Sequence, residues 1–366
     1  MTESFISPLA ETIIMLRRLE VKNYKSLKKV EIQLEKFNTL IGLNASGKSN
    51  FIDCLAFLSE SIQVFPSLAP LFERRGGFGR VAFQGEEHIT LKAIFQDGNH
   101  KSEYYLRCAG ESVEERHLRV NGRMIIQERS GAGNYVSKEG EEKSFSVPWT
   151  ELAGKVSNDY ALRHMSRWRF YSFTVPSIRR ENSARKQLNL ERDGSNLAQV
   201  LLTLKTERPK TFSAIEEVLK LAIPEVEELL TPLTEEGNTY VAIQEKGFAP
   251  FDYHQVSDGT LRLLAYITAL NLDVDLICFE EPENFVHPQL LRLLAEILKK
   301  SDKQIVLSTH SPYFLDHLEP EDLIIVEKKD GKTKLRRVEA EKQKKEIQNL
   351  LEEGIPLGEA YYSGAI

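Results

Sequence analysis

The sequence contains few of the residue types whose abundance would define a specialised class of protein. Among 366 residues there are three cysteines, which lie far apart at Cys54, Cys108 and Cys278. That number and spacing exclude a disulfide framework and a cysteine-ligated zinc site, and they fit a reducing cytosol. No apolar run reaches the length of a membrane span. We therefore expect a cytoplasmic protein with no membrane partner.

Neither sign of charge is in enough excess to identify a partner. The net charge is −6 and the isoelectric point about 5.9, so binding to nucleic acid would need a local basic patch. Hydrophobic residues make up 41% and charged residues 28%, as in ordinary globular chains of one to three domains. Residues 1–14 carry two glutamates and lack the basic start of a signal peptide. We interpret them as a loose extension or the result of an upstream start.

Hydrophobic periodicity divides the first two thirds of the chain. Alternating apolar residues predict a strand pair over about residues 19–34, and "NTLIG" predicts a third strand. Beyond Lys48 the period becomes helical. Residues 78–150 are rich in strand and turn patterns, and within them "RSGAGNYVSKEGEEKS" is predicted to be an exposed loop. Helical patterns dominate from about 190 to 230.

The last hundred residues alternate short apolar runs with helical patterns. The runs "DLICF", "QIVLS" and "DLIIVEKK" are typical of strands buried on both faces, and a helix follows Pro288. The sequence thus predicts an α/β fold with a mixed, largely parallel sheet flanked by helices. An antiparallel β part would precede this sheet, and a helical lobe would be inserted.

A glycine-rich segment, "TLIGLNASGKSNFIDCL", lies between a predicted strand and a predicted helix. Its G-x-x-x-x-G-K-S spacing lets backbone N–H groups and the helix N-terminus surround phosphate oxygens. Lys48 would reach the β- and γ-phosphates, and Ser49 would ligate Mg²⁺. A chance match is the alternative, which the strand and helix on either side disfavour. The residues predicted to hold the nucleotide are Gly42, Asn44, Ala45, Ser46, Gly47, Lys48, Ser49 and Asn50.

Two carboxylates end a predicted buried strand in "DLICFEEPENFVHP". Such a pair is costly without a cation, so Glu280 is predicted to hold Mg²⁺ and Glu281 to act as general base. The alternative is a surface pair of carboxylates. In "IVLSTHSPYF", His310 ends a strand and is predicted to hydrogen-bond the γ-phosphate, although a lone histidine is more often structural. His287 has no comparable context.

A fourth segment, "QVSDGTLRLLAYITAL", opens a predicted amphipathic helix at Ser257. The simpler interpretation is that Ser257 caps the helix. The alternative is that this N-terminus, with Ser257 and Gly259, also binds phosphate.

Together these segments resemble the ABC-type ATPase heads of the SMC/RecF/OLD-like superfamily. The P-loop is "GLNASGKS", the signature "VSDGT", Walker B "LICFEE" and the switch histidine "LSTHS"; the opening "LRRLEVKNYKSLKKVEIQL" is also similar. Short stand-alone predicted ATPases of the AAA-type, RecF-like group are most similar, and their ends resemble "LGEAYYSGAI". The resemblance implies a P-loop NTPase head over 15–366. Its parts would be a P-loop lobe at 15–110, an inserted β/helical region at 111–255, and a lobe with the other motifs at 256–366.

The resemblance also implies ATP and Mg²⁺ as cofactors, and ATP hydrolysis with Glu281, His310 and Lys48 in catalytic roles. It implies a homodimer in which Ser257 and Gly259 of one protomer close over the ATP of the other. The chain departs from the pattern in having Glu280 where many relatives have aspartate, and "SDGT" without a double glycine. For the Q-loop, Gln84 and the segment "FYSFTVPS" are competing candidates. We expect no long coiled arms, zinc hook or appended nuclease domain.

The biological role stays open between two hypotheses. One is a nucleotide-gated clamp acting on double-stranded DNA in repair, replication or phage defence. Its candidate phosphate contacts are Arg179, Arg180, Arg185 and Lys186, which are otherwise a solvated loop. The other is an ATP-driven switch controlling a separate effector such as a nuclease or toxin, which the acidic total charge favours. A transporter ATPase is disfavoured by the long insertion, and "EKQKKE" is interpreted as the solvated face of a helix.

Overall fold

The computed structural model describes residues 14–98, 100–156, 160–284, 288–338, 347 and 349–363. The extension 1–13, His287 and the "EKQKKE" run lie outside the described residues. The chain divides into two compact units, each assembled from three stretches of sequence. The first unit comprises 1–36, 50–166 and 327–336, and the second comprises 37–49, 167–326 and 337–366. The three consecutive parts predicted within 15–366 stay a prediction.

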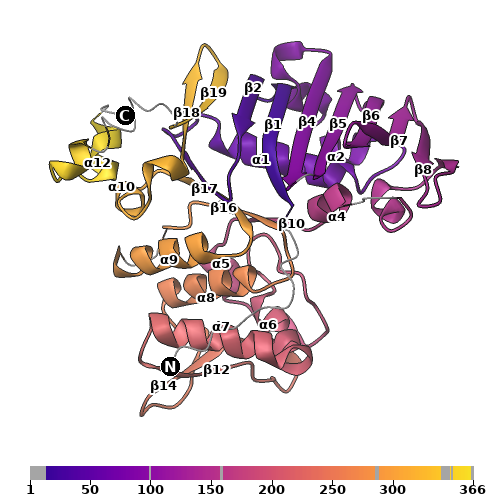
Figure 1. Ribbon diagram of the computed structural model, residues 1–366. Helices are drawn as coiled ribbons and strands as arrows, with labels where there is room; N and C mark the ends of the chain where they lie inside the picture. The colour runs from indigo at the N-terminus through magenta and orange to yellow at the C-terminus, as the bar shows by residue number, and fades with distance from the viewer. Residues whose placement is uncertain are drawn as a thin grey trace. The chain divides into compact units, whose positions relative to one another are not determined.

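The first unit contains an eight-stranded sheet in the order β2-β1-β4-β5-β6-β7-β8-β9, which Figure 1 shows. Every neighbouring pair of strands is antiparallel. This confirms the predicted antiparallel β part near the N-terminus. The strands are β1 Met15–Tyr24, β2 Leu27–Gln33, β4 His88–Asp97, β5 His100–Ala109, β6 Ser112–Val120, β7 Arg123–Arg129, β8 Ala132–Val136 and β9 Glu142–Phe145.

Helix α1 follows the glycine-rich loop, and its apolar side chains are buried in the first unit (Figure 1). A buried polar contact fixes its C-terminal end. Arg116, which is 0% exposed, donates to Glu128 and, over 2.5 Å, to the carbonyl of Ser61. The helices on this side are α1 Lys48–Ser61, α2 Ala69–Glu73, α3 Phe78–Val81 and α4 Tyr160–Ser166, with 3₁₀ turns η1 Phe83–Gly85 and η2 Trp149–Leu152.

The predicted loop at "RSGAGNYVSKEGEEKS" is wrong in part, because strands β8 and β9 form a hairpin there. Most of its residues are exposed, as expected, but Gly133 is buried in β8. A Cβ on Gly133 would lie 2.2 Å from the ring of Phe145 on the paired strand. The glycine therefore makes room for an aromatic side chain across the ladder, where the sequence indicated a flexible turn.

The second unit contains a six-stranded sheet in the order β10-β16-β17-β3-β18-β19. The pairs from β10 to β18 are parallel, which confirms the predicted α/β class. Strands β3 and β17 are buried along their whole length, as the continuous apolar runs required. The strands are β3 Phe37–Ile41, β10 Trp168–Tyr171, β16 Leu276–Glu280, β17 Gln304–Thr309, β18 Leu323–Lys329 and β19 Lys332–Arg337.

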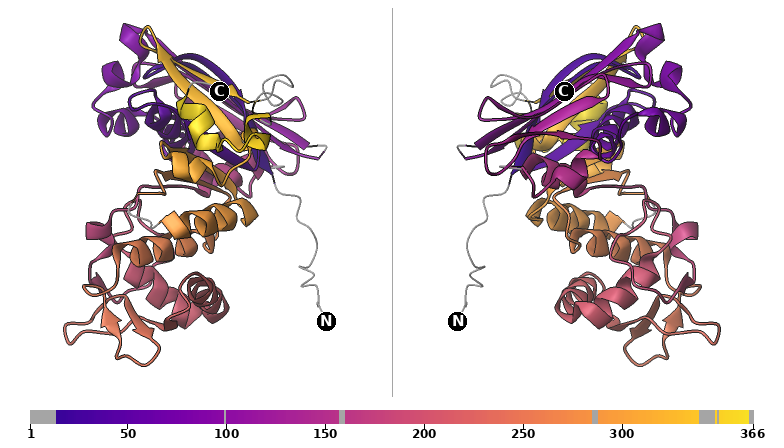
Figure 2. Two further views of the ribbon diagram at one scale, coloured as in Figure 1. Left: turned by 90° about the vertical axis from the view of Figure 1, so that its left-hand side faces the viewer. Right: turned by 90° about the vertical axis from the view of Figure 1, so that its right-hand side faces the viewer.

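Helices α9, α8 and α7 are stacked in succession in the second unit, and small β-ladders follow α7 (Figures 1 and 2). These helices are α5 Val175–Ile178, α6 Leu197–Glu207, α7 Pro209–Ala222, α8 Asp258–Leu270, α9 Pro288–Lys300, α10 Pro312–Leu315 and α12 Leu357–Tyr362, with the 3₁₀ turn η3 Pro320–Asp322. The short strands are β11 Asn182–Ser183, β12 Val226–Leu230, β13 Asn238–Thr239, β14 Ala242–Glu245 and β15 Phe251–Asp252. No helix in the described part of the chain has both the length and the apolar character needed to cross a bilayer.

Candidate functional site

The glycine-rich loop runs from the end of β3 to the start of α1, within the second unit. A Cβ on Gly42 would lie 2.2 Å from the backbone oxygen of Val326, so only glycine fits there. Gly47 and Ala45 both adopt positive φ, at 114° and 62°. These dihedrals turn consecutive peptide units toward the inside of the loop, which is the geometry of a backbone anion cradle.

Lys48 is buried at the base of this loop. Its Nζ donates to the carbonyls of Gly42 over 2.7 Å and of Leu43 over 3.2 Å. Burial lowers the pKa of the Lys48 ammonium, while the carboxylates of Glu281 and Glu283 act to raise it. A bound phosphate would give this desolvated cation a further partner, so the loop fits an anionic ligand.

Parallel pairing brings the ends of three strands to one edge of the sheet. Glu280 of β16 is in register with Ser308 of β17, and Thr309 is in register with Ile41 of β3. The residues that follow these positions are Glu281, His310 and Gly42. The sheet thus gathers the predicted general base, the switch histidine and the phosphate loop, although they come from three distant parts of the sequence.

Glu281 and His310 contact one another directly. The Nδ1 atom of His310 lies 3.1 Å from Oε1 of Glu281, and the side chain of Asn284 donates to Oε2 over 2.8 Å. Glu281 has a φ of 48°, which is rare for a residue with a side chain. Strained residues of this kind cluster at functional sites. Here the strain accompanies a carboxylate held from both of its oxygens.

Glu283 is an acidic residue of the site that the sequence analysis missed. It is only 8% exposed, and its Oε1 accepts from the hydroxyl of Thr309 over 2.6 Å and from the N–H of His310 over 3.2 Å. Within the part of the chain that the structure describes, no group donates to Oε2. Burial raises the pKa of the Glu283 carboxyl, and hydrogen bonds act against that shift. The third acid of "EEPEN" was the only signal available in the sequence.

The predicted Mg²⁺ ligand Glu280 makes an ion pair that the sequence analysis also missed. Arg192 donates to its Oε1 over 2.7 Å. The loop that carries Arg192 is tied to the segment after β10, because Ser172 N–H donates to Arg192 O and Thr174 N–H to Asp193 O. Arg192 therefore lies beside the acidic strand end by construction of the backbone.

The signature segment has the simpler of its two predicted roles. Ser257 is the N-cap of α8, and its hydroxyl accepts from the N–H of Thr260 over 3.1 Å. Asp258, the acid next to it, pairs with Arg179 over 2.7 Å. Arg179 also donates to the backbone of Tyr253 and Val256. The predicted phosphate role of Ser257 and Gly259 stays a prediction.

The predicted basic cluster is thus only partly available to a ligand. Arg179 is bound to the segment that leads into α8, and Lys186 pairs with Glu207 over 2.7 Å at the surface. Arg180 and Arg185 are exposed. Asn50, predicted to contact the nucleotide, belongs to the first unit, where its amide donates to the hydroxyl of Ser26.

A cavity of about 770 Å³ adjoins the acidic strand end. It is lined on one side by residues 172–176, which belong to the "FYSFTVPS" candidate for the Q-loop. The other candidate, Gln84, lies in the first unit. The charged and amide side chains around the cavity are Arg179, Asp258, Arg262, Glu280, Glu281 and Asn284.

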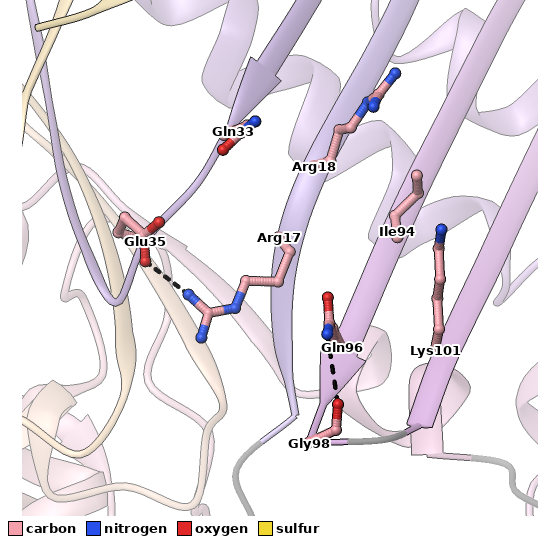
Figure 3. Close-up of a pocket in the computed structure, with 8 residues that line it drawn as sticks. All are labelled: Arg17, Arg18, Gln33, Glu35, Ile94, Gln96, Gly98 and Lys101. Atoms are coloured by element: carbon pink, nitrogen blue, oxygen red, sulfur yellow. Dashed lines mark hydrogen bonds and ion pairs between the residues drawn. The ribbon is translucent and has the colours of Figure 1, made fainter. Parts of the chain in front are cut away.

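A second cavity of about 580 Å³ lies on the eight-stranded sheet of the first unit (Figure 3). Three cations line it, but Arg17 pairs with Glu35 over 2.6 Å, and Arg18 pairs with Glu31. Figure 3 shows Arg17 turned toward Glu35. These carboxylates cancel much of the positive field, so the cavity is a poor anion site.

The residues present fit a nucleotide with Mg²⁺. Among the described residues, no three His, Cys, Asp or Glu side chains gather in a metal-binding group. Mg²⁺ in nucleotide sites needs fewer, because it takes one or two protein oxygens together with phosphate oxygens and waters. The exposed hydroxyl of Ser49 and the carboxylate of Glu280 would supply such oxygens.

Two solved structures share this fold. A crystal structure of an SMC head bound to the C-terminal winged-helix domain of ScpA aligns with a TM-score of 0.59 at 16% identity, covering 90% of this chain and 99% of that one. An SMC head with an extended coiled coil, bound to a ScpA domain from Pyrococcus furiosus, aligns with a TM-score of 0.56 at 17% identity over 93% and 99%. The chain therefore has the P-loop NTPase fold of ABC-type heads.

Two curated relatives are longer than this chain. An OLD nuclease of Thermus scotoductus is 23% identical over 361 residues, which is 86% of this chain and 62% of that protein. The ribosome protection protein VmlR of Bacillus subtilis is 28% identical over 109 residues, 30% of this chain and 20% of that protein. The chain thus spans less than two thirds of either relative.

A family model matches residues 37–316, more than half of the chain and every motif from the phosphate loop to the switch histidine. The relatives and the fold place it in the ABC-type SMC/OLD-like ATPase superfamily. The chain belongs to the family described as "AAA domain, putative AbiEii toxin, Type IV TA system".

Proposed function

We propose that this chain binds ATP with Mg²⁺ at the loop from Gly42 to Ser49 and hydrolyses the γ-phosphate. The observation that supports this most is the meeting of the phosphate loop, Glu281 and His310 at one sheet edge. Family membership supports the same activity. Mg²⁺, when bound, neutralises phosphate charge, and Ser49 and Glu280 are its candidate ligands.

Each side chain of the site has a role that its position supports. Lys48 offers its buried ammonium to the phosphates, and Glu281 accepts the proton of an attacking water. Asn284 and His310 hold the two oxygens of Glu281 and so orient it. With Nδ1 of His310 occupied by Glu281, donation to a phosphate must come from Nε2.

Hydrolysis by three purified proteins tests this function. Glu281→Gln keeps the shape of the general base and should lower the turnover rate by about a hundredfold or more while ATP still binds. Lys48→Ala should weaken ATP binding itself by more than about tenfold. Lys36→Ala, an exposed lysine before β3, is the matched control. Equal turnover rates in wild type and Glu281→Gln would show that the site is not an ATPase centre.

We further propose that ATP closes a homodimer in which Ser257 and Gly259 of one protomer cover the ATP of the other. Both motifs lie on the surface of the second unit: Leu43 in the phosphate loop is 72% exposed, and Ser257 is exposed. Size analysis of Glu281→Gln with and without ATP tests the closure. A monomer at saturating ATP would refute it.

The biological role we propose is action on or near double-stranded DNA, in repair, replication or phage defence. The exposed Arg180 and Arg185 support it. The alternative is a switch for a separate protein effector such as a nuclease or toxin. The pairing of Arg179 with Asp258 and of Lys186 with Glu207 favours this alternative, because it removes half of the basic cluster.

ATP hydrolysis with and without linear duplex DNA, at low and raised salt, separates the two roles. Stimulation that fades with salt supports the DNA role, since phosphate contacts weaken as counterions accumulate. A rate that DNA leaves unchanged, but that Glu281→Gln abolishes, supports a protein partner.

A further inference from the structure

A short helix near the end of the described chain contacts the switch-histidine segment. Helix α12 lies beside α10, which begins two residues after His310 (Figure 1). Leu357 and Ala360 of α12 are buried. A Cβ on Gly358 would lie 2.3 Å from the carbonyl oxygen of Pro312, and the N–H of Gly358 donates to Asp316 over 2.8 Å. The two backbones thus touch at a point that only glycine permits.

The docked helix presents one hydroxyl to the site. Tyr362, in the last turn of α12, donates from its OH to the backbone carbonyl of His310. Burial raises the pKa of this phenol, and the carboxylate of Glu283 adds to the shift, so Tyr362 keeps its proton and remains a donor. Its neighbour Tyr361 stacks edge-on against it but packs toward the core.

His310 is therefore held at three separate points. Tyr362 binds its carbonyl, Glu283 accepts from its N–H over 3.2 Å, and Glu281 lies 3.1 Å from its ring. The two backbone contacts fix the peptide units on either side of the Cα, and through them the direction of the side chain. Losing one contact frees a rotation that swings the imidazole away from Glu281.

We propose that Tyr362 is a positioning residue for His310, and that α12 thereby sets the rate of the chemical step. This inference rests on the proposed ATPase function. Tyr362 touches neither the phosphate loop nor the acidic pair in any contact the described residues show, so its effect passes through the histidine. Turnover should depend on Tyr362, and ATP affinity should not.

The test compares Tyr362→Phe with Tyr361→Phe, which removes the same hydroxyl one residue away. Tyr362→Phe should lower kcat about fivefold, the worth of one hydrogen bond, and leave KM within about twofold. The effect stays moderate because Tyr362 is 49% exposed and water competes for the carbonyl. Tyr361→Phe should stay within about twofold of wild type in both constants.

A double-mutant cycle separates positioning from general damage. In a His310→Ala background the backbone carbonyl remains but the ring is gone, so Tyr362→Phe should cause no further loss. The imidazole NMR signals of His310, assigned by their loss in His310→Ala, should move in Tyr362→Phe and not in Tyr361→Phe. A structural role would lower kcat in both backgrounds and leave the His310 signals in place.

The outcomes distinguish this inference from the proposed function. A wild-type protein without ATPase activity overturns both. An active wild type that His310→Ala slows, and Tyr362→Phe does not, overturns the inference alone. Equal losses from Tyr361→Phe and Tyr362→Phe also overturn it.

Discussion

Arg192 and Glu280 form an ion pair at the end of β16, with 2.7 Å between Nη2 and Oε1. Their positions are 88 residues apart in the sequence. Arg192 is exposed at 61% of its side chain, while Glu280 is exposed at 19%. The carboxylate proposed to hold Mg²⁺ is thus shared with a mobile cation that competes for the same oxygen.

Arg192→Gln should therefore tighten Mg²⁺ binding. An exposed ion pair is worth about 0.2–1 kcal/mol, so the Mg²⁺ concentration for half-maximal ATP binding should fall about two- to fivefold. Titration of Mg²⁺ against a fluorescent ATP analogue measures this. Arg123→Gln, an exposed arginine on β7, controls for the change in net charge. A rise in the required Mg²⁺ would instead assign Arg192 to the phosphates.

Glu283→Gln should change how stability depends on pH. The pKa of the folded carboxyl is raised, so its contribution is fully present below the unfolded value near 4.5 and is lost as pH rises through the folded pKa. Glutamine imitates the protonated form, while Lys48, Glu281, His310 and Tyr362 around it are unchanged. The variant should unfold at a higher denaturant concentration than wild type at about pH 8, and at a similar one at acid pH.

Chemical denaturation at several pH values measures this difference. Glu73→Gln, at the exposed end of α2, is the control and should follow wild type throughout. A Glu283→Gln protein that is less stable than wild type at alkaline pH would show that the ionised carboxylate is required.

Arg179→Gln should destabilise the second unit. The guanidinium satisfies the carbonyls of Tyr253 and Val256 together with Asp258, all in the segment that opens α8. Loss of these bonds should cost about 1–3 kcal/mol in the free energy of unfolding. Arg185→Gln should change it by less than about 0.5 kcal/mol, as exposed substitutions do. Equal stability of the two variants would return Arg179 to the candidate DNA contacts.

Gly358→Ala should slow ATP turnover without changing Tyr362. The new Cβ overlaps the Pro312 carbonyl, so α12 has to move away from α10 and carry the tyrosine with it. We expect a fall in kcat at least as large as that of Tyr362→Phe, measured at saturating ATP. Gly79→Ala, where a Cβ meets nothing within 4 Å, is the matched control. Wild-type turnover in Gly358→Ala would show that the docking of α12 is not needed.

The sequence predicted those parts of the molecule that depend on neighbours along the chain. The strand, glycine loop and helix around Lys48 follow from residue order, as does the buried strand ending at Glu280. The parallel sheet could be predicted too, because continuous apolar runs alternate with helices. The predicted roles of the site residues stay predictions, although the sheet brings Lys48, Glu281 and His310 to one edge.

Contacts between distant segments were not predictable from patterns. Arg192 and Tyr362 reach the site across 88 and 52 residues, and neither lies in a motif. Glu283 differs from an exposed acid only through burial, which depends on the packing of the following strand. The hairpin at β8 and β9 was missed because its glycines indicated a turn, whereas Gly133 accommodates Phe145.

The left-handed backbone of Glu281 sets the site against the stability of the fold. At a φ of 48°, a residue with a side chain costs about 1–2 kcal/mol more than glycine would. Replacement by glycine or asparagine relieves that strain and removes the carboxylate at the same time. Selection for heat resistance alone would therefore favour loss of the general base, and only selection for turnover can retain it.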